Sequence, residues 1–195
     1  MKIIRLAGPL LALLLPLYAL AQSEVEPGVT LTSIVSAVEH TPDGHTKVET
    51  IHPTAILSNA HTGSNIARGL VYSGQHNTVE LAGVKSNLIL TTATPAFYIH
   101  IDPDDPNNQR EMMTLVRLKP AKETRIVFNF TANAFGGSRK RHVDVIAVTK
   151  VDVPGNWLKI TPQAPLPAGE YGIVLLPTQA LLFPDRVYDF SIPAK

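Results

Sequence analysis

The chain contains no cysteine, and this absence excludes several classes of protein. Without thiols there is no disulfide framework, no cysteine-ligated zinc or iron–sulfur centre and no thiol nucleophile. An excess of charge of one sign is also lacking, because 17 basic residues face 16 acidic residues. Nucleic acids and acidic membranes select clearly basic faces, so the composition predicts no nucleic-acid partner.

A long apolar run occurs only at the amino terminus. Residues 6–21 carry no charge, follow the basic residues Lys2 and Arg5, and end in the small-residue triplet Ala19-Leu20-Ala21. This arrangement is typical of a secretory signal peptide, with cleavage expected before Gln22. The run is shorter than the ~20 residues that a membrane-spanning helix needs. We therefore expect a cleaved signal peptide over residues 1–21, not a membrane anchor.

The expected mature chain, residues 22–195, has no membrane span and is nearly neutral. Removing Lys2 and Arg5 from the 17 basic residues leaves 15, against 16 acidic residues. An exported chain without cysteine must be held together by packing alone, whereas small secreted eukaryotic domains usually depend on disulfides. The sequence thus predicts a secreted or periplasmic bacterial protein.

The patterns along the chain are those of strands. Apolar residues alternate with polar ones over residues 97–102, 125–131 and 187–192, which predicts three strands that are buried on one face. Residues 171–176 are continuously apolar and predict a strand covered on both faces, and residues 142–153 predict a long or bent strand. The residues expected to point inward in the alternating strands are Phe97, Ile99, Ile101, Ile126, Phe128, Phe130, Tyr188, Phe190 and Ile192.

Proline and glycine turns punctuate these segments, as in Pro42-Asp43-Gly44 and Pro154-Gly155-Asn156. Short strands at this spacing predict an all-β fold, specifically an immunoglobulin-like antiparallel β-sandwich of about eight to ten strands with little helix. We expect residues 22–195 to form one sandwich domain. The stretch near residues 102–109, rich in Asp, Pro and Asn, is interpreted as a long loop inside it.

One turn is more specific. The segment Leu166-Pro167-Ala168-Gly169-Glu170-Tyr171 resembles the tyrosine corner of immunoglobulin-like and fibronectin-III-like sandwiches, in which a tyrosine hydroxyl bonds to upstream backbone. The alternative is a tight turn before a strand that begins with tyrosine.

Two further segments accompany this turn, Leu158-Lys159-Ile160-Thr161-Pro162 and Val187-Tyr188-Asp189-Phe190. Together the three segments resemble exported bacterial β-rich proteins of uncharacterised function, with a Leu-Pro-x-Gly-Glu-Tyr turn and a terminal Tyr-Asp-Phe strand. The resemblance covers the last third of the chain, and more loosely residues 95–118. It implies an all-β fold and export, and it carries over no catalytic residue.

Catalytic motifs are lacking: there is no Gly-x-Ser-x-Gly, Ser-x-x-Lys, His-Glu-x-x-His or phosphate-binding loop. Among the seven histidines, His100 shares a strand face with Tyr98 and Asp102. His100 and Asp102 supply two of the four ligands that a zinc or copper site needs, and no other two can be named. We expect this face to be exposed and to hold no structural metal.

Three weaker patterns each have a functional and a structural interpretation. Asp102, Asp104 and Asp105 offer oxygen ligands for calcium, or form a turn. The basic cluster Ser138-Arg139-Lys140-Arg141-His142 suits a phosphate, a sulfated glycan or an acidic lipid, or else a solvated hairpin tip or edge-strand guard. The candidate rings for stacking a sugar are Trp157, Tyr72 and Tyr98, and we expect Trp157 to be a core residue instead.

These patterns favour an exported non-enzymatic domain that acts as a binding or structural module, in the bacterial envelope or outside the cell. Its partner is expected to be a protein or a glycan. The sequence assigns no catalytic residue, no cofactor-binding residue, no cofactor and no metal ligand. The alternatives are a metal-assisted hydrolase with a dispersed site that includes His100 and Asp102, and self-assembly by strand addition.

Overall fold

The structure is a computed structural model that describes residues 24–26, 28–41, 43–60, 74–133, 140–176, 184 and 186–194. The predicted signal peptide, residues 1–21, lies outside the described residues. The all-β class is confirmed, because one short helix accompanies 14 strands in the described segments. No helix in these segments has the length and apolar content that crossing a bilayer requires. The elements are β1 (Glu24–Glu26), β2 (Val29–Thr30), β3 (Val35–His40), β4 (Thr46–Thr50), β5 (Pro53–Ala60), β6 (Gly74–Ala82), β7 (Ala96–His100), α2 (Pro106–Met112), β8 (Met113–Pro120), β9 (Thr124–Asn133), β10 (Lys140–Val145), β11 (Val148–Val153), β12 (Trp157–Pro162), β13 (Gly169–Leu175) and β14 (Arg186–Ile192).

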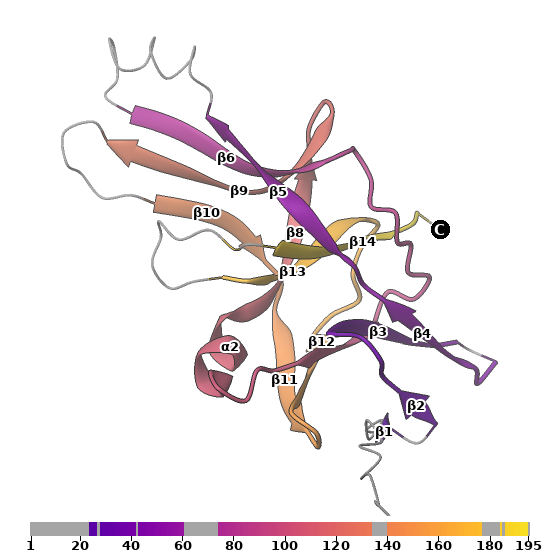
Figure 1. Cartoon of the computed structure of the whole chain (residues 1–195). Coiled ribbons are helices and arrows are strands. Elements are labelled where there is room, and N and C mark those ends of the chain that lie inside the picture. The colour runs from indigo at the N-terminus through magenta and orange to yellow at the C-terminus, as the bar shows by residue number, and fades with distance from the viewer. Residues whose placement is uncertain are drawn as a thin grey trace, which may run out of the picture.

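The strands form a closed barrel, a separate five-stranded sheet and the two-stranded pair of β1 and β2 (Figure 1). The barrel order is β10-β8-β13-β14-β5-β6-β9, closed by pairing of β9 with β10 and with an additional pairing of β8 with β9, and the sheet order is β11-β12-β7-β3-β4. The predicted immunoglobulin-like sandwich of eight to ten strands thus differs from the observed pairing. The reason is that β5, β6, β9 and β10 continue the wall of β8, β13 and β14 until its two edges meet.

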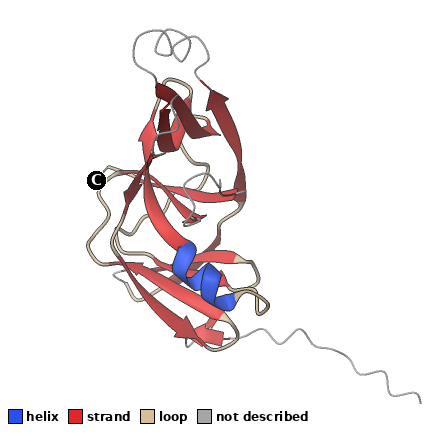
Figure 2. Ribbon diagram, turned by 90° about the vertical axis from the view of Figure 1, so that its left-hand side faces the viewer, coloured by secondary structure: helices blue, strands red, loops and turns tan. Residues whose placement is uncertain are grey.

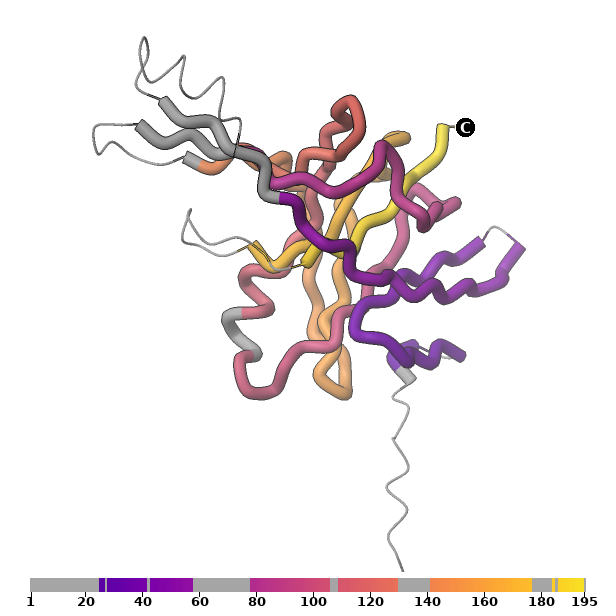
Figure 3. The backbone as a smooth tube through the Cα atoms, turned by 45° about the horizontal axis from the view of Figure 1, so that its top comes forward, coloured from indigo at the N-terminus to yellow at the C-terminus, as the bar shows by residue number. Residues whose placement is uncertain are grey.

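The predicted long strand at residues 142–153 is two strands in two different sheets. β10 ends at Val145 in the barrel, and β11 begins at Val148 at the edge of the five-stranded sheet. Between them, the amide of Ile146 bonds to the carbonyl oxygen of Leu115 at 2.9 Å. The chain also crosses between the sheets after β4, β6, β7 and β12, as the coloured trace in Figure 3 shows.

The main core lies between the five-stranded sheet and the barrel wall of β8, β13 and β14. Phe97 of β7 meets Phe190 of β14 with ring centroids 4.9 Å apart, and Tyr171 of β13 stacks on the same ring at 5.6 Å. Ile99 and Ile173 complete this contact from the two sides. The predicted inward positions Phe97, Ile99 and Phe190 are therefore confirmed.

A second core fills the barrel. It comprises Val79, Leu81, Val116, Leu118, Val127, Phe128, Val174 and Val187. Both neighbours Val127 and Phe128 are buried, because the register of β6 and β9 shifts between Val79 and Glu80. Gly172 faces this core, where a Cβ atom would lie 2.6 Å from Cγ1 of Val187, so the close approach of β14 requires glycine.

Strands β13 and β14 are covered on both faces. This was predicted for residues 171–176. The structure confirms it, because Tyr171 faces the five-stranded sheet and Val174 faces the barrel interior. For residues 187–192 the prediction of a half-buried strand is wrong, because Val187 and Asp189 are buried together with Phe190.

A third layer covers the outer face of the five-stranded sheet. Val29 and Leu31 of the amino-terminal segment pack with Val38, Tyr98 and Trp157. Trp157 is thus a core residue, as predicted. Tyr98, predicted to be exposed, is fully buried, because alternation cannot show that a second layer covers the polar side of a strand.

The expected long loop near residues 102–109 is a turn that leads into a helix. Asp102 Oδ1 accepts a 3.0 Å hydrogen bond from the amide of Asp104, and Pro106 occupies the first helical turn of α2, where its missing N–H costs nothing. Figure 2 shows this helix in blue, in front of the strands.

The hydrogen bond of a tyrosine corner is present. The buried Tyr171 donates its hydroxyl proton to the carbonyl oxygen of Pro167, four residues upstream, at 2.7 Å. The bond fixes the turn before β13 enters the two cores.

We expect Tyr171→Phe to lower the free energy of unfolding by about 1 kcal/mol, because the ring is kept and one hydrogen bond is lost. Pro167 is exposed, so water partly replaces the hydroxyl. Urea unfolding measures the change. Tyr188→Phe is the matched control, since no described residue bonds its hydroxyl, and should cost less than ~0.5 kcal/mol. Equal effects of the two variants would contradict a stabilising corner.

Candidate functional site

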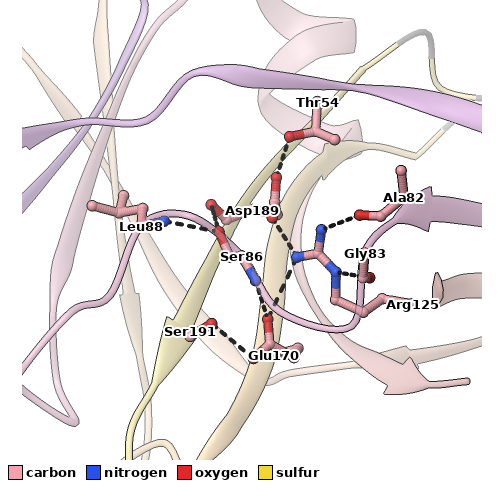
Figure 4. A network of polar contacts seen from close by, with 9 residues as sticks. All are labelled: Thr54, Ala82, Gly83, Ser86, Leu88, Arg125, Glu170, Asp189 and Ser191. Atoms are coloured by element: carbon pink, nitrogen blue, oxygen red, sulfur yellow. Dashed lines mark hydrogen bonds and ion pairs between the residues drawn. The ribbon is translucent and has the colours of Figure 1, made fainter. Parts of the chain in front are cut away.

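Three charged side chains are buried together where β9, β13 and β14 meet the segment 83–88 (Figure 4). Arg125 is 2% exposed, Glu170 7% and Asp189 5%. Burying charge is costly unless each charge is paired and hydrogen-bonded. The contacts of each atom therefore decide what this cluster can do.

Arg125 donates hydrogen bonds from all three of its guanidinium nitrogens. Nη1 lies 2.5 Å from Asp189 Oδ2 and 3.4 Å from Glu170 Oε2. Nε and Nη2 donate to the carbonyl oxygens of Gly83 and Ala82, each at 3.0 Å. The side chain thus joins two carboxylates to the end of β6.

The two carboxylates use all four of their oxygens. Glu170 Oε2 also accepts from the amide of Ser86 at 2.8 Å, and Oε1 accepts from Ser191 Oγ at 2.7 Å. Asp189 Oδ1 accepts from Thr54 Oγ1 at 2.5 Å. Because every carboxylate oxygen accepts a hydrogen bond from the protein, the cluster acts as a cross-link between strands and the segment 83–88.

A cleft of about 890 Å³ opens beside this cluster, between β4, β5 and the segment 83–88. Its lining residues are Val48, Glu49, Thr50, His52, Thr54, Ala82, Gly83, Lys85, Ser86, Asn87, Leu88, Arg125 and Asp189. Arg125 and Asp189 contribute to its wall, but their polar atoms are held by the protein. The other ionisable residues of the lining are Glu49, His52 and Lys85.

The sequence did not reveal this cluster. Asp189 falls between Tyr188 and Phe190 in an alternating segment, a pattern that assigns it to solvent. Two features of the sequence could have indicated the cluster. Asp189 is a carboxylate between two aromatic residues, and Glu170 directly precedes the apolar run 171–176. Pairing these two with Arg125 required the strand order.

The structure does not bring Tyr98, His100 and Asp102 into one site. The exposed His100 ring meets Trp157 edge-on with centroids 5.1 Å apart, and Asp102 belongs to the turn before α2. Nowhere in the described ranges do three His, Asp or Glu residues gather as a metal would need, and this includes Asp102, Asp104 and Asp105.

Tyr98 instead belongs to a second polar cluster. Glu26 of β1 accepts hydrogen bonds from the Tyr98 hydroxyl and from Lys159 Nζ, and His40 Nε2 lies 3.3 Å from its other oxygen. Burial alone would raise the pKa of Glu26, but the hydrogen bonds from Lys159 and Tyr98 and the nearby charges outweigh it and hold the pKa below its usual value. Burial and the bond to Glu26 raise the pKa of Tyr98 to about 12. The cluster fastens β1 to the five-stranded sheet.

The basic cluster predicted at residues 138–142 lies partly within the structure. Ser138 and Arg139 fall outside the described residues, and Lys140 begins β10. Arg141 and His142 line a groove of about 740 Å³ between β8, β9 and β10. Arg117 and Lys119 of β8 line the same groove, which sequence spacing alone did not connect to the cluster.

Comparisons with protein-family models, with curated proteins and with solved structures each return no match. The class of the protein then follows from its own structure. It is an all-β protein in which a closed barrel carries a five-stranded sheet and a buried, fully bonded charge cluster.

We expect Arg125→Met to lower the free energy of unfolding by about 3–5 kcal/mol, because it leaves two buried carboxylates without a cation. The triple variant Arg125→Met, Glu170→Gln, Asp189→Asn removes all three charges and should be more stable than the single variant. Urea unfolding compares the two. A triple variant that is less stable than Arg125→Met would contradict the charge-balance account.

The Glu26 cluster predicts an acid-sensitive contribution to stability. Because the folded pKa of Glu26 lies below its ordinary value of 4.5, the stabilisation is present above pH 4.5 and is lost as pH falls through the folded pKa. Glu26→Gln should therefore lose less stability than the unaltered chain between about pH 6 and pH 3 in urea titrations. Glu123→Gln, at an exposed side chain, is the control and should follow the unaltered chain. Identical pH profiles for all three would rule out the contribution.

Proposed function

We propose that the chain is an exported, non-enzymatic β-domain that serves as a binding or structural module in the bacterial envelope or outside the cell. Its five-stranded sheet, packed on the barrel wall of β8, β13 and β14, acts as an immunoglobulin-like sandwich scaffold from which the rest of the barrel extends. This proposal combines a stable framework with surface grooves that are open to a partner.

The observation that carries the non-enzymatic part is the atom-by-atom bonding of the buried charge cluster. Arg125, Glu170 and Asp189 are the charged groups that an active site would draw on, yet each carboxylate oxygen and each guanidinium nitrogen already has a protein partner. Such a cluster stabilises a scaffold. A substrate would have to compete with these protein bonds for any of the three groups.

Export is supported by the amino-terminal sequence and by the layout of the fold. The charged start, the apolar run over residues 6–21 and the triplet Ala19-Leu20-Ala21 are those of a cleaved leader. All 14 described strands lie between Glu24 and Ile192, so cleavage before Gln22 leaves each of them intact. The absence of cysteine makes the buried charge cluster and the two cores the means of holding the exported chain together.

A sugar-stacking surface is not part of the proposal. Trp157 and Tyr98, two of the three candidate rings, are buried beneath the amino-terminal layer, and Tyr72 lies outside the described residues. The groove lined by Arg117, Lys119 and Arg141 is the more polar alternative for a partner.

Expression of the full chain with its own leader in a bacterium, followed by fractionation and amino-terminal sequencing, tests the proposal. We expect the protein in the periplasm or the medium, beginning at Gln22. Retention in the cytoplasm with Met1 in place would reject export. Turnover of a hydrolase substrate by the purified protein, abolished by His100→Ala, would reject the non-enzymatic assignment in favour of the dispersed hydrolase.

A further inference from the structure

The groove between β8, β9 and β10 lies at the seam where the barrel closes. β10 pairs first with β9, from Lys140 to Val143, and then with β8, at Asp144 and Val145. β8 in turn pairs with β9 only at Lys119 and Pro120. The three strands therefore diverge around a concave site of about 740 Å³, which is large enough for an organic ligand and much larger than a single inorganic ion.

Positive charge dominates the lining of this groove. The side chains of Arg117, Lys119 and Arg141 contribute three permanent cations, and Asp144 contributes the one carboxylate. Asp144 lies opposite Arg117 in the β8–β10 register, but within the described segments none of the three cations forms an ion pair. The guanidinium of Arg117 is held by the protein, because Nη2 donates to the carbonyl oxygen of Ala168 at 3.3 Å and the group lies over the ring of Tyr171. The buried Arg125, in contrast, has two carboxylate partners.

Arg141 is the most informative of these residues. Its guanidinium lies over the ring of Phe128, 5.9 Å from the centroid, and its Nη1 atom is buried without a hydrogen-bond partner. Burial also lowers the pKa of Arg141. An unpaired guanidinium N–H in such a place destabilises the fold, so a structural role does not explain it. A solvated hairpin tip, one of the two structural interpretations of the basic cluster, would leave this group in water.

The rest of the lining combines the polar residues Asn129 and His142 with apolar residues. The apolar members are Leu118, Pro120, Ile126, Val127, Phe128 and Val143. A guanidinium group is suited to paired hydrogen bonds with phosphate oxygens, and a groove with cations on apolar walls suits an anionic head joined to an apolar body. The geometry thus favours an amphiphilic anion over a neutral sugar.

We infer that the seam groove binds the phosphate group of an organic ligand, with Arg141 and Lys119 contacting the phosphate oxygens and the apolar residues of the lining contacting the attached body. This inference rests on the proposed binding function and specifies its ligand class. A soluble phosphate ester and a phospholipid headgroup share this chemistry.

The full chain, in the form that expression yields, is titrated at low ionic strength with inorganic phosphate, with glycerol 3-phosphate and with phosphatidylcholine vesicles that contain about one third phosphatidylglycerol. Pure phosphatidylcholine vesicles are the uncharged control. Binding of glycerol 3-phosphate identifies a soluble source, and binding of the anionic vesicles alone identifies a lipid source. Either result supports the inference, whereas binding of neither rejects it.

Three variants test whether binding takes place at the groove itself. Arg141→Met and the exposed Lys119→Met should each weaken binding by about tenfold or more. Arg186→Met removes an exposed cation of the barrel that lies outside the groove and should leave binding unchanged. Equal weakening by Arg186→Met would indicate general attraction of charge and reject the site.

A stability measurement separates a binding role from a structural one. Because the guanidinium of Arg141 is not fully bonded, Arg141→Met should unfold at the same urea concentration as the unaltered chain or at a higher one. A destabilised Arg141→Met with unchanged binding would assign Arg141 to the scaffold and overturn the inference. An exported protein that binds none of the phosphate probes rejects the ligand class alone, whereas a protein that binds them but stays in the cytoplasm with Met1 rejects export alone.

Discussion

The guanidinium of Arg125 is the interaction on which the arrangement of the barrel depends. It binds carboxylates of β13 and β14 and backbone carbonyls at the end of β6, so that it ties elements far apart in sequence to one point. Ser86 and Thr54 extend the same network to the segment 83–88 and to β5. In a chain without disulfides, this is a directional constraint that apolar packing does not provide. Its directionality fixes which strands meet, while the two cores supply most of the favourable burial.

A second arginine, Arg141, differs from Arg125 in that its guanidinium is not fully hydrogen-bonded. Arg125 is buried with its charge balanced, whereas Arg141 lies over an aromatic ring with one nitrogen unbonded. Selection for stability alone favours the first arrangement and disfavours the second. Under the proposed function, one arginine holds the fold and the other contacts a ligand. The proposed ligand site then lies at the seam of the barrel, away from the buried charge cluster.

Local pattern and turn chemistry predicted the class and several details of the fold. The all-β assignment, the inward Phe97 and Ile99, the doubly covered strand at Tyr171 and its corner to Pro167 depend on residues close in sequence. Barrel closure does not, because it depends on whether strands distant in sequence, such as β5 and β14, pair. The burial of Tyr98 and Asp189 was missed for the same reason: a layer or a cation contributed from elsewhere in the chain covers them. The basic residues 138–142 were recognised from the sequence. Arg117 and Lys119, which line the same groove, could be assigned to it only once the position of β10 beside β8 was known.

The repeated crossing of the chain between sheet and barrel also governs when the fold can form. β5 lies between β6 and β14, so this part of the barrel is incomplete until residues 186–192 have been made, and the five-stranded sheet needs β12 before its centre is paired. Contacts this distant in sequence form slowly. During synthesis β5 can pair with β6, and β7 with β3, but β5 lacks β14 and β7 lacks β12 until those later strands have been made. If the chain is exported as proposed, late completion of the barrel and sheet would delay folding until after passage through the membrane.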